Sequence, residues 1–182
     1  MRVVSGKYKG KHFDVPSSFK ARPTTDFAKE NLFNILSNVY VDFESGPTAL
    51  DLFSGTGSIS LELLSRGCSQ VVSVEKDFRH WQYLHRISKE LGDRNWKPLH
   101  ADVFKFIGRG GGPFDIIFAD PPYALPNLAE IPNLIFEKGL LAEDGLFVLE
   151  HGKNLNFSEE PHFIEHRSYG SVNFSFFHKE ER

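Results

Sequence analysis

Residues 48–67 read "TALDLFSGTGSISLELLSRG", and this stretch decides the fold. Its first six residues form an apolar run typical of a buried strand. The turn that follows contains two glycines, which let the backbone bend tightly. Beyond the turn, apolar residues recur at helical spacing up to Gly67, the expected end of a helix. A buried strand, a glycine turn and a helix in succession predict an α/β protein built on a parallel sheet.

The same alternation continues along the chain. We expect a helix from Asp77 to Leu91, a brief helix before the turn GRGGGP, and a helix interrupted by Pro126 and Pro132. The tail at 162–179 predicts two antiparallel strands joined at Tyr169-Gly170, which would form an edge hairpin of the sheet. Further apolar strands are expected at 70–75, 97–102, 114–120 and 145–151.

The N-terminal part predicts a small extension of this core. Residues 2–15 have the pattern of two short strands around a Lys-rich turn. A helix should follow within 22–39, opened by Thr24 and Thr25, with one apolar face that consists of Ala28, Leu32, Ile35, Leu36 and Val39. A chain of 182 residues is most simply one domain, here a basic hairpin over 1–22 and a core over 23–182.

Composition narrows the class of protein. Hydrophobic residues make up 40% and charged residues 25%, which is ordinary for a globular protein. No window approaches the run of about 20 apolar residues that a membrane span requires. The N-terminus lacks the apolar region of a signal peptide. With Cys68 as the single cysteine, we expect a reducing compartment and a cytoplasmic location.

The net charge of −3 conceals an asymmetry. Residues 1–22 carry six Lys and Arg against one Asp, a formal charge of +5, so the remainder carries −8. Such a basic segment is either a solvated surface or a contact for nucleic acid phosphates.

Acidic residues stand at the ends of three successive predicted strands: Asp51, Glu75 and Asp102. Ligands of such sheets bind at the carboxyl ends of the strands. A dinucleotide fits poorly, because Ser60 replaces the third glycine of the usual motif and Asp51 would repel a pyrophosphate. The signature of a nucleoside triphosphate site is absent as well. A ligand that has a cationic amine and no phosphate fits better, and S-adenosylmethionine is such a ligand.

Each acidic residue then has an expected role toward that ligand. Asp51 would compensate the methionine ammonium, Glu75 would accept hydrogen bonds from the ribose hydroxyls, and Asp102 would accept one from the adenine amino group. Gly55 and Gly57 would allow close backbone approach. The predicted cofactor set is completed by their neighbours Phe53, Lys76 and Val103.

The sequence "FADPPYAL" (118–125) ends the most hydrophobic strand. It is either a stiff surface turn or a clamp for a flat substrate. As a clamp, Asp120 would accept a hydrogen bond from an exocyclic amino group and the Pro121 carbonyl would take the second N–H. Pro121 and Pro122 would fix the turn. Tyr123 would stack on the base, a contact worth about 1–3 kcal/mol. A base held in this way must leave its stack.

Seven segments together resemble the RsmD family, whose members modify N2 of a guanine in a loop of small-subunit (16S) ribosomal RNA. These are GKYKG (6–10), RPTTD (22–26), LFNIL (32–36), DLFSGTGS (51–58), VEKD (74–77), DPPY (120–123) and DGLFVLEH (144–151). DPPY and DLFSGTGS are shared by many amino-methyltransferases, whereas the pairing of GKYKG with RPTTD is more particular to this family.

The resemblance implies a Rossmann-like class I methyltransferase fold with a seven-stranded sheet, S-adenosylmethionine as donor, and the small ribosomal subunit or its RNA as target. It also implies an RNA-contacting set that consists of Lys7, Lys9, Lys11, Arg22 and Thr24. Where the family usually has a basic residue after TTD, this chain has Phe27, with Lys29 nearby.

Two alternatives stay open. One is an amino-methyltransferase that acts on DNA adenine or cytosine or on a protein glutamine, although such enzymes more often have Asn at the first position of the DPPY motif. The other is an RNA-binding module that has lost its activity. No metal site is expected, because the histidine pairs His80/His85 and His162/His166 lack further ligands at suitable spacing. His151 is expected to be an ordinary histidine at a strand end.

Overall fold

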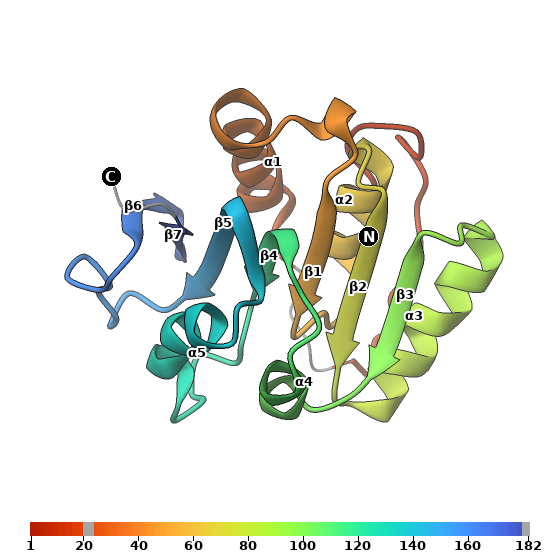
Figure 1. Cartoon of the computed structure of the whole chain (residues 1–182). Helices are drawn as coiled ribbons and strands as arrows, with labels where there is room; N and C mark the ends of the chain where they lie inside the picture. Colours follow the sequence, from red (N-terminus) through yellow and green to blue (C-terminus); the bar gives the residue numbers. More distant parts are fainter. Residues whose placement is uncertain (20–23, 180–182) are drawn as a thin grey trace.

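The computed structural model describes residues 1–19 and 24–179 (Figure 1). Within these residues, seven strands form one sheet in the order β3-β2-β1-β4-β5-β7-β6. Strands β1 to β5 run parallel to one another, and β7 lies antiparallel between β5 and β6. This arrangement confirms the predicted parallel sheet with an antiparallel edge hairpin. The strands are β1 (Thr48–Leu52), β2 (Gln70–Glu75), β3 (Trp96–His100), β4 (Phe114–Ala119), β5 (Leu141–His151), β6 (Phe163–Tyr169) and β7 (Val172–His178).

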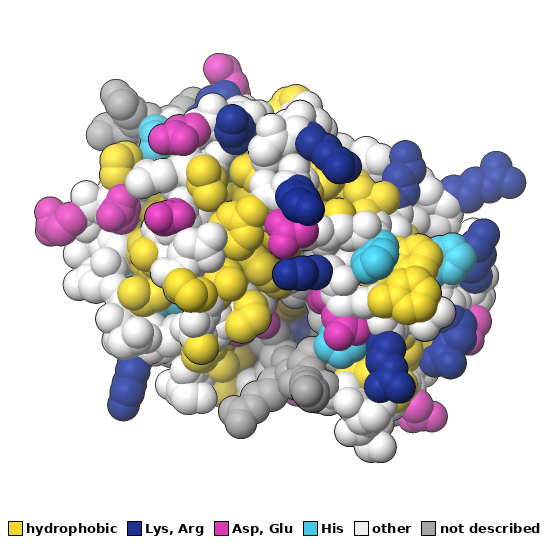
Figure 2. All heavy atoms as spheres, turned by 90° about the horizontal axis from the view of Figure 1, so that it is seen from below, with side chains coloured by type: hydrophobic (Ala, Val, Ile, Leu, Met, Phe, Trp, Pro, Cys, Tyr) yellow, Lys and Arg dark blue, Asp and Glu magenta, His cyan; other side chains and the backbone are white. Residues whose placement is uncertain are grey.

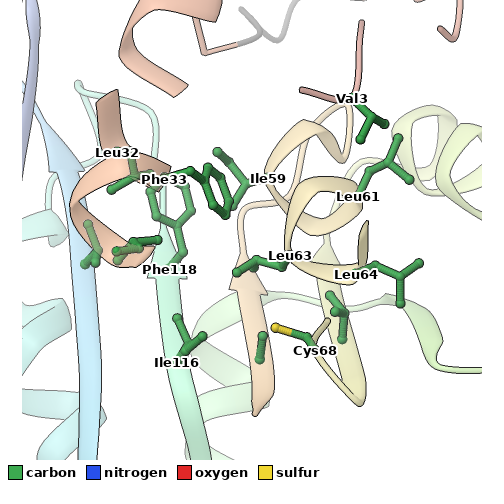
Figure 3. Packing of buried hydrophobic residues seen from close by; sticks show 14 of the residues in the cluster. Val3, Leu32, Phe33, Ile59, Leu61, Leu63, Leu64, Cys68, Ile116 and Phe118 are labelled. Carbon is green, nitrogen blue, oxygen red and sulfur yellow. The ribbon is translucent and has the colours of Figure 1, made fainter. Parts of the chain in front are cut away.

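Helices cover both faces of the sheet (Figure 1). The core on one face includes residues of α1, α2 and α3, and the core on the other includes residues of α4 and α5. Figure 3 shows Phe33 of α1 beside Phe118 of β4, and Val3 of the N-terminal segment beside Leu61 of α2. The α-helices are α1 (Asp26–Ile35), α2 (Ser58–Arg66), α3 (Phe78–Leu91), α4 (Val103–Arg109) and α5 (Ile131–Glu137). Short 3-10 turns occupy Phe43–Ser45 and Leu128–Glu130, and a π-helical turn occupies Leu36–Tyr40.

The ends of the helices follow the sequence signals. Thr25 caps α1, because its hydroxyl accepts a hydrogen bond from the backbone N–H of Ala28 at 3.2 Å. Gly67 ends α2 with a φ of 127°, as predicted. Val39 is not on the buried face of the first helix as predicted: it is 63% exposed. The helix widens into the π-helical turn at Leu36, which rotates later residues away from the face set by the earlier spacing.

The N-terminal hairpin is reduced to a single antiparallel bridge between Arg2 and His12, rather than two strands. Backbone hydrogen bonds still join its two arms, from the Val3 N–H to the Lys11 carbonyl and from the Phe13 N–H to the Met1 carbonyl, both at 2.9 Å. The pairing stays short because the next N–H groups, those of Val4 and Ser5, donate to the carboxylate of Glu62 at 2.9 and 3.0 Å. The segment is therefore held both by its own pairing and by α2.

The parallel strands place the loops that follow β1, β2, β3 and β4 at one edge of the sheet, the lower edge in Figure 1. All three acidic strand ends and the DPPY turn lie along this edge. In residues 1–19 and 24–179, no helix combines the length and apolar character needed to cross a membrane.

Candidate active site

A cavity of about 1020 Å³ opens at the carboxyl edge of the sheet. It brings together most of the residues predicted for the cofactor and the acceptor, although they come from four separate loops. The predicted residues in its lining are Thr24, Asp51, Phe53, Gly55, Glu75, Lys76, Asp102, Val103, Asp120, Pro121, Pro122 and Tyr123.

Asp51 lies at the bottom of this cavity and is 1% exposed. One of its carboxylate oxygens accepts hydrogen bonds from the backbone N–H and the hydroxyl of Ser60, at 3.1 and 2.6 Å. Burial raises the pKa of Asp51 to about 7, although the bonds from Ser60 act in the opposite direction. The carboxyl group therefore gains or loses its charge near neutral pH, and a cation in the cavity would favour the charged form.

Glu75 fixes the glycine-rich loop. Its two carboxylate oxygens accept one backbone N–H each, from Gly55 and from Asp77, both at 2.8 Å. Each oxygen keeps a further lone pair for a ligand. Beside it, Phe53 has a φ of 58°, an uncommon conformation for a residue with a side chain, and its ring lies 6.4 Å from that of Phe104.

Gly57, also predicted to allow close approach of the cofactor, is required for packing. It begins α2 with a φ of 78°, and a Cβ atom there would overlap the side chain of Leu84 on α3. The glycine is thus required by close packing of two helices. Gly55, by contrast, is part of the cavity lining.

Asp102 caps α4, since its carboxylate accepts the N–H of Lys105 at 3.0 Å. Its other oxygen lies 3.7 Å from the ammonium of Lys76, whose side chain is 78% exposed. Val103 begins the helix and, with Phe104, gives this end of the cavity an apolar wall. The wall and the Asp102 carboxylate together suit a flat heterocycle that carries an amino group.

The DPPY turn forms the other end of the cavity, and it has a partner that the sequence did not reveal. Glu150, near the end of β5, is 5% exposed and lines the same cavity. Its Oε2 accepts a hydrogen bond from the Tyr123 hydroxyl at 3.3 Å, and its Oε1 is buried without a partner. Burial raises the pKa of Asp120 well above its ordinary value, and the adjacent Glu150 carboxylate raises it further. Both causes favour the protonated form of Asp120 over the charged form.

Glu150 was missed because it stands inside the apolar run GLFVLEH and resembles an isolated polar residue of a strand. Its position could have identified it as a site residue. Glu150 lies near the end of the strand next to the one that leads to Asp120. Asp51, Glu75 and Asp102 were predicted at the ends of their strands in the same way.

The mouth of the cavity near this end is formed by the start of α1 and the turn between β6 and β7. Thr24 and Thr25 line it from one side, and Ser171 and Val172 from the other. Phe27, which stands where a basic residue was expected, is 61% exposed, and its ring lies 6.3 Å from that of Tyr169 at an angle of 84°.

The lysines predicted to bind RNA lie elsewhere. Lys7 donates a hydrogen bond to Asp93 at 2.7 Å, and Asp93 follows the end of α3 that is remote from the cavity. Lys9 and Lys11 are exposed on the same turn. Arg22 lies outside the described residues.

Lys29, the other cation considered, is 1% exposed and therefore not on the surface. Its ammonium donates to the Arg2 carbonyl and to Ser58, and it lies 3.4 Å from Glu62. The ion pair with Glu62 makes Lys29 a structural cation inside the protein.

The histidines are engaged in ring contacts and hydrogen bonds. His80 packs on Phe19, and the ring of His162 stacks on Phe136. His151 is fully buried between the Gly152 carbonyl and the Ser175 hydroxyl, and burial lowers its pKa. Among residues 1–19 and 24–179, no group of three or more His, Cys, Asp or Glu is arranged to hold a metal ion.

Known proteins are similar to this chain in sequence and in fold. A family model described as "Conserved hypothetical protein 95" matches residues 1–178. Ribosomal RNA small subunit methyltransferase D of Escherichia coli is 35% identical over 150 residues, which are 82% of this chain and 74% of the relative. The "Putative rRNA methyltransferase YlbH" of Bacillus subtilis is 34% identical over 169 residues, 87% of this chain and 86% of the relative.

The solved structure of "Putative methyltransferase yhhF" from Escherichia coli superposes with a TM-score of 0.85 at 29% identity, over 100% of this chain and 99% of that one. The matching family model, the identities over most of each chain and the shared fold agree with one another. The chain belongs to the RsmD family of class I S-adenosylmethionine-dependent methyltransferases.

Proposed function

We propose that this protein transfers a methyl group from S-adenosylmethionine to the exocyclic N2 amino group of a guanine in small-subunit ribosomal RNA. One observation carries the proposal: the DPPY turn and the three carboxylates at the strand ends line one cavity. The relatives named ribosomal RNA small subunit methyltransferase D support the substrate class. We place the reaction in the cytoplasm, with either the small subunit or its free RNA as the partner.

The lining of the cavity suits the methyl donor. Asp51 offers a buried negative charge for the ammonium, and Glu75 offers a lone pair on each carboxylate oxygen for the ribose hydroxyls. Phe53, Phe104 and Asp102 supply apolar and hydrogen-bonding contacts for adenine. When bound, S-adenosylmethionine supplies an electrophilic methyl group on a positively charged sulfur.

The acceptor end then activates and orients an amine whose lone pair is delocalised into the base. Asp120 accepts a hydrogen bond from one N–H, and the carbonyl of Pro121 accepts the other. As the new N–C bond forms, the bond between the methyl group and sulfur would break and leave the neutral thioether S-adenosylhomocysteine, and the nitrogen loses a proton that the Asp120 carboxylate takes up. The raised pKa of Asp120 suits it to hold that proton. Tyr123, 46% exposed and tethered to Glu150, stacks on the base.

The test is to incubate the protein with labelled donor and, in separate reactions, with 30S particles, free 16S ribosomal RNA and duplex DNA. We expect label on guanine N2 in one or both RNA samples and none in DNA. Label on adenine, cytosine or protein would contradict the proposal, and so would the absence of transfer to all substrates. The comparison of particle with free RNA identifies the form of the partner.

A variant separates chemistry from binding. Asp120→Ala should abolish transfer and leave the affinity for S-adenosylmethionine nearly unchanged, because Asp120 faces the amine. Asp14→Ala is the matched control, since the Asp14 side chain is fully exposed. Full activity of Asp120→Ala would refute the assignment.

A further inference from the structure

An exposed group of aromatic and histidine rings lies on α3 and β3 next to the cavity. It consists of Phe78, Trp81, His85 and His100, which we name the ring patch. The centroid of the Trp81 ring is 5.7 Å from that of Phe78, 5.3 Å from that of His85 and 5.5 Å from that of His100. Phe78 is 52% exposed, and both histidines are exposed. A group of large apolar rings on the surface of a protein usually marks an interaction site.

The rings are held in place without being part of the core. The core side of α3 is formed by Tyr83, Leu84 and Ile87 instead. The indole N–H of Trp81 donates to the Pro98 carbonyl at 3.2 Å, and Nε2 of His100 lies 3.0 Å from the Lys76 carbonyl. Because the rings are already ordered, the protein loses little conformational entropy when a partner stacks on them.

The surroundings of the ring patch are basic. Residues 76–109 carry eight Lys and Arg against four Asp and Glu, a formal charge of +4 in a chain of −3. Lys76 and Arg79 flank Phe78 in the sequence and are exposed. Figure 2 views the cavity edge: on the side of α3 and β3, hydrophobic and histidine side chains lie among Lys and Arg. This combination of rings and positive charge fits single-stranded nucleic acid.

The ring patch also continues directly from the active site. Lys76, Asp77 and His80 line the cavity, and Phe78 stands between them in the sequence. An RNA segment that delivers a base to Tyr123 can therefore cross the cavity mouth and reach the rings.

We propose that the ring patch stacks unpaired nucleotides of the RNA segment that carries the target guanine, while Lys76 and Arg79 contact its phosphates. This inference rests on the proposed function for its RNA partner. Nucleotides near a base that leaves its stack lose their own stacking partners, and aromatic rings replace them. Because every base has a flat face, such contacts strengthen binding without reading the sequence.

The first test is the affinity of Phe78→Ala for a short single-stranded oligonucleotide that contains the target loop, measured by fluorescence anisotropy. We expect about tenfold weaker binding, as when roughly one base is no longer stacked, with unchanged affinity for S-adenosylmethionine. Val39→Ala is the matched control, because Val39 is a 63% exposed apolar residue on a π-helical turn away from α3. Equal RNA affinity of Phe78→Ala and wild type would overturn the inference.

The second test combines the fluorescence of the intact protein with the salt dependence of RNA binding. Trp81 is partly exposed whereas Trp96 is 4% exposed, so RNA stacked on the patch should quench the Trp81 fluorescence of the intact protein. Arg79→Ala should lower the slope of log affinity against log salt by about 0.7, and Lys138→Ala should leave it unchanged. RNA binding without quenching would place the RNA elsewhere, and quenching only by a ribosomal protein would replace RNA with a protein partner.

These readouts are binding measurements, so they separate the two proposals. Guanine methylation by wild type together with unaltered RNA binding by Phe78→Ala would refute the ring patch and leave the proposed function intact. RNA binding and quenching without transfer to any RNA would refute the proposed function alone.

Discussion

At the scale of single residues, the activity depends on carboxyl groups that the fold removes from water. Asp51 is charged only above its raised pKa of about 7. Below that pH the neutral acid offers no counter-charge to an ammonium, so we expect the affinity for S-adenosylmethionine to fall by up to about tenfold per pH unit. Calorimetry between about pH 8 and about pH 6 measures this fall. Asp51→Asn should bind more weakly and lose the pH dependence, and parallel curves for both proteins would exclude Asp51 as the ammonium contact.

Asp120 titrates with a raised pKa, first because it is buried and then because the Glu150 carboxylate is adjacent. Asp120 accepts a hydrogen bond from the amine only in its charged form, so the rate of methyl transfer should fall as pH falls through this raised pKa. Glu150→Gln removes the neighbouring carboxylate, so we expect the fall in rate to shift to lower pH than in wild type. Glu150→Ala, which also removes the hydrogen bond to Tyr123, should be slower at every pH. A pH–rate profile of Glu150→Gln that matches wild type would show that Glu150 does not affect Asp120.

The raised pKa of Asp120 also affects stability in a definite direction. The pKa of Asp120 is raised in the folded protein, so the folded state binds a proton more tightly than the unfolded state does. The resulting stability is present below the ordinary pKa of 3.8 and is lost as pH rises through the raised value. Thermal unfolding should show a smaller alkaline loss of stability for Glu150→Gln than for wild type, because the variant lacks the carboxylate that raises the pKa of Asp120 further. An identical loss would mean that Glu150 does not raise the pKa of Asp120.

At the scale of elements, one buried carboxylate joins the N-terminal segment to α1 and α2. Glu62 is 0% exposed and accepts the N–H groups of Val4 and Ser5, and the Arg66 side chain donates to it at 3.0 Å. Lys29 of α1 lies 3.4 Å from it, and burial lowers the pKa of that lysine. The network reaches the cavity, because Lys29 also donates to Ser58 in the lining.

Removal of the Glu62 carboxylate should lower the free energy of unfolding. Glu62→Ala leaves the Lys29 ammonium buried without a counter-charge, so we expect a loss of about 3–5 kcal/mol in the free energy of unfolding. Replacement of both by apolar residues, Glu62→Met with Lys29→Met, should recover part of that loss. Urea denaturation measures each value, and Arg2→Ala, which removes an exposed and weak ion pair to Glu30, is the control. A loss below about 1 kcal/mol for Glu62→Ala would show that the network is not needed for folding.

This network also shows which features could not be predicted from the sequence. The alternation of strands and helices, the edge hairpin and the three acidic strand ends follow from local patterns, and the structure confirms the fold. In the sequence Lys29 is a candidate contact for RNA phosphates, yet it pairs inside the protein with Glu62, 33 residues further along the chain. The oversight of Glu150 and the shortened pairing of the N-terminal arms have the same cause. Burial of a charge and pairing of a backbone depend on contacts between distant segments, which no local period encodes.

At the scale of the whole molecule, charge is divided between regions. Residues 1–22 and 76–109 carry +5 and +4, so the rest of the chain carries −12. The two basic regions meet along α3, whose start adjoins the cavity and whose end adjoins Lys7 through Asp93. A helix of 14 residues is about 21 Å long, so the N-terminal lysines lie well away from the reacting base.

That separation predicts how the N-terminal lysines act. Combined replacement of Lys7, Lys9 and Lys11 by Ala should hardly change the binding of a short stem-loop, which cannot reach from the cavity to the far end of α3. With full-length ribosomal RNA or the 30S particle, the same variant should bind more weakly and show a flatter salt dependence, by about 0.7 in log–log slope for each single-strand phosphate that the protein no longer touches. Lys7 should contribute least, because Asp93 already neutralises it. Arg79→Ala, which changes a residue beside the cavity, should weaken the binding of both the short stem-loop and the full-length RNA. If the lysine variant instead bound the short stem-loop more weakly, the RNA would have to approach from the opposite edge of the sheet, and the path across the ring patch would be wrong.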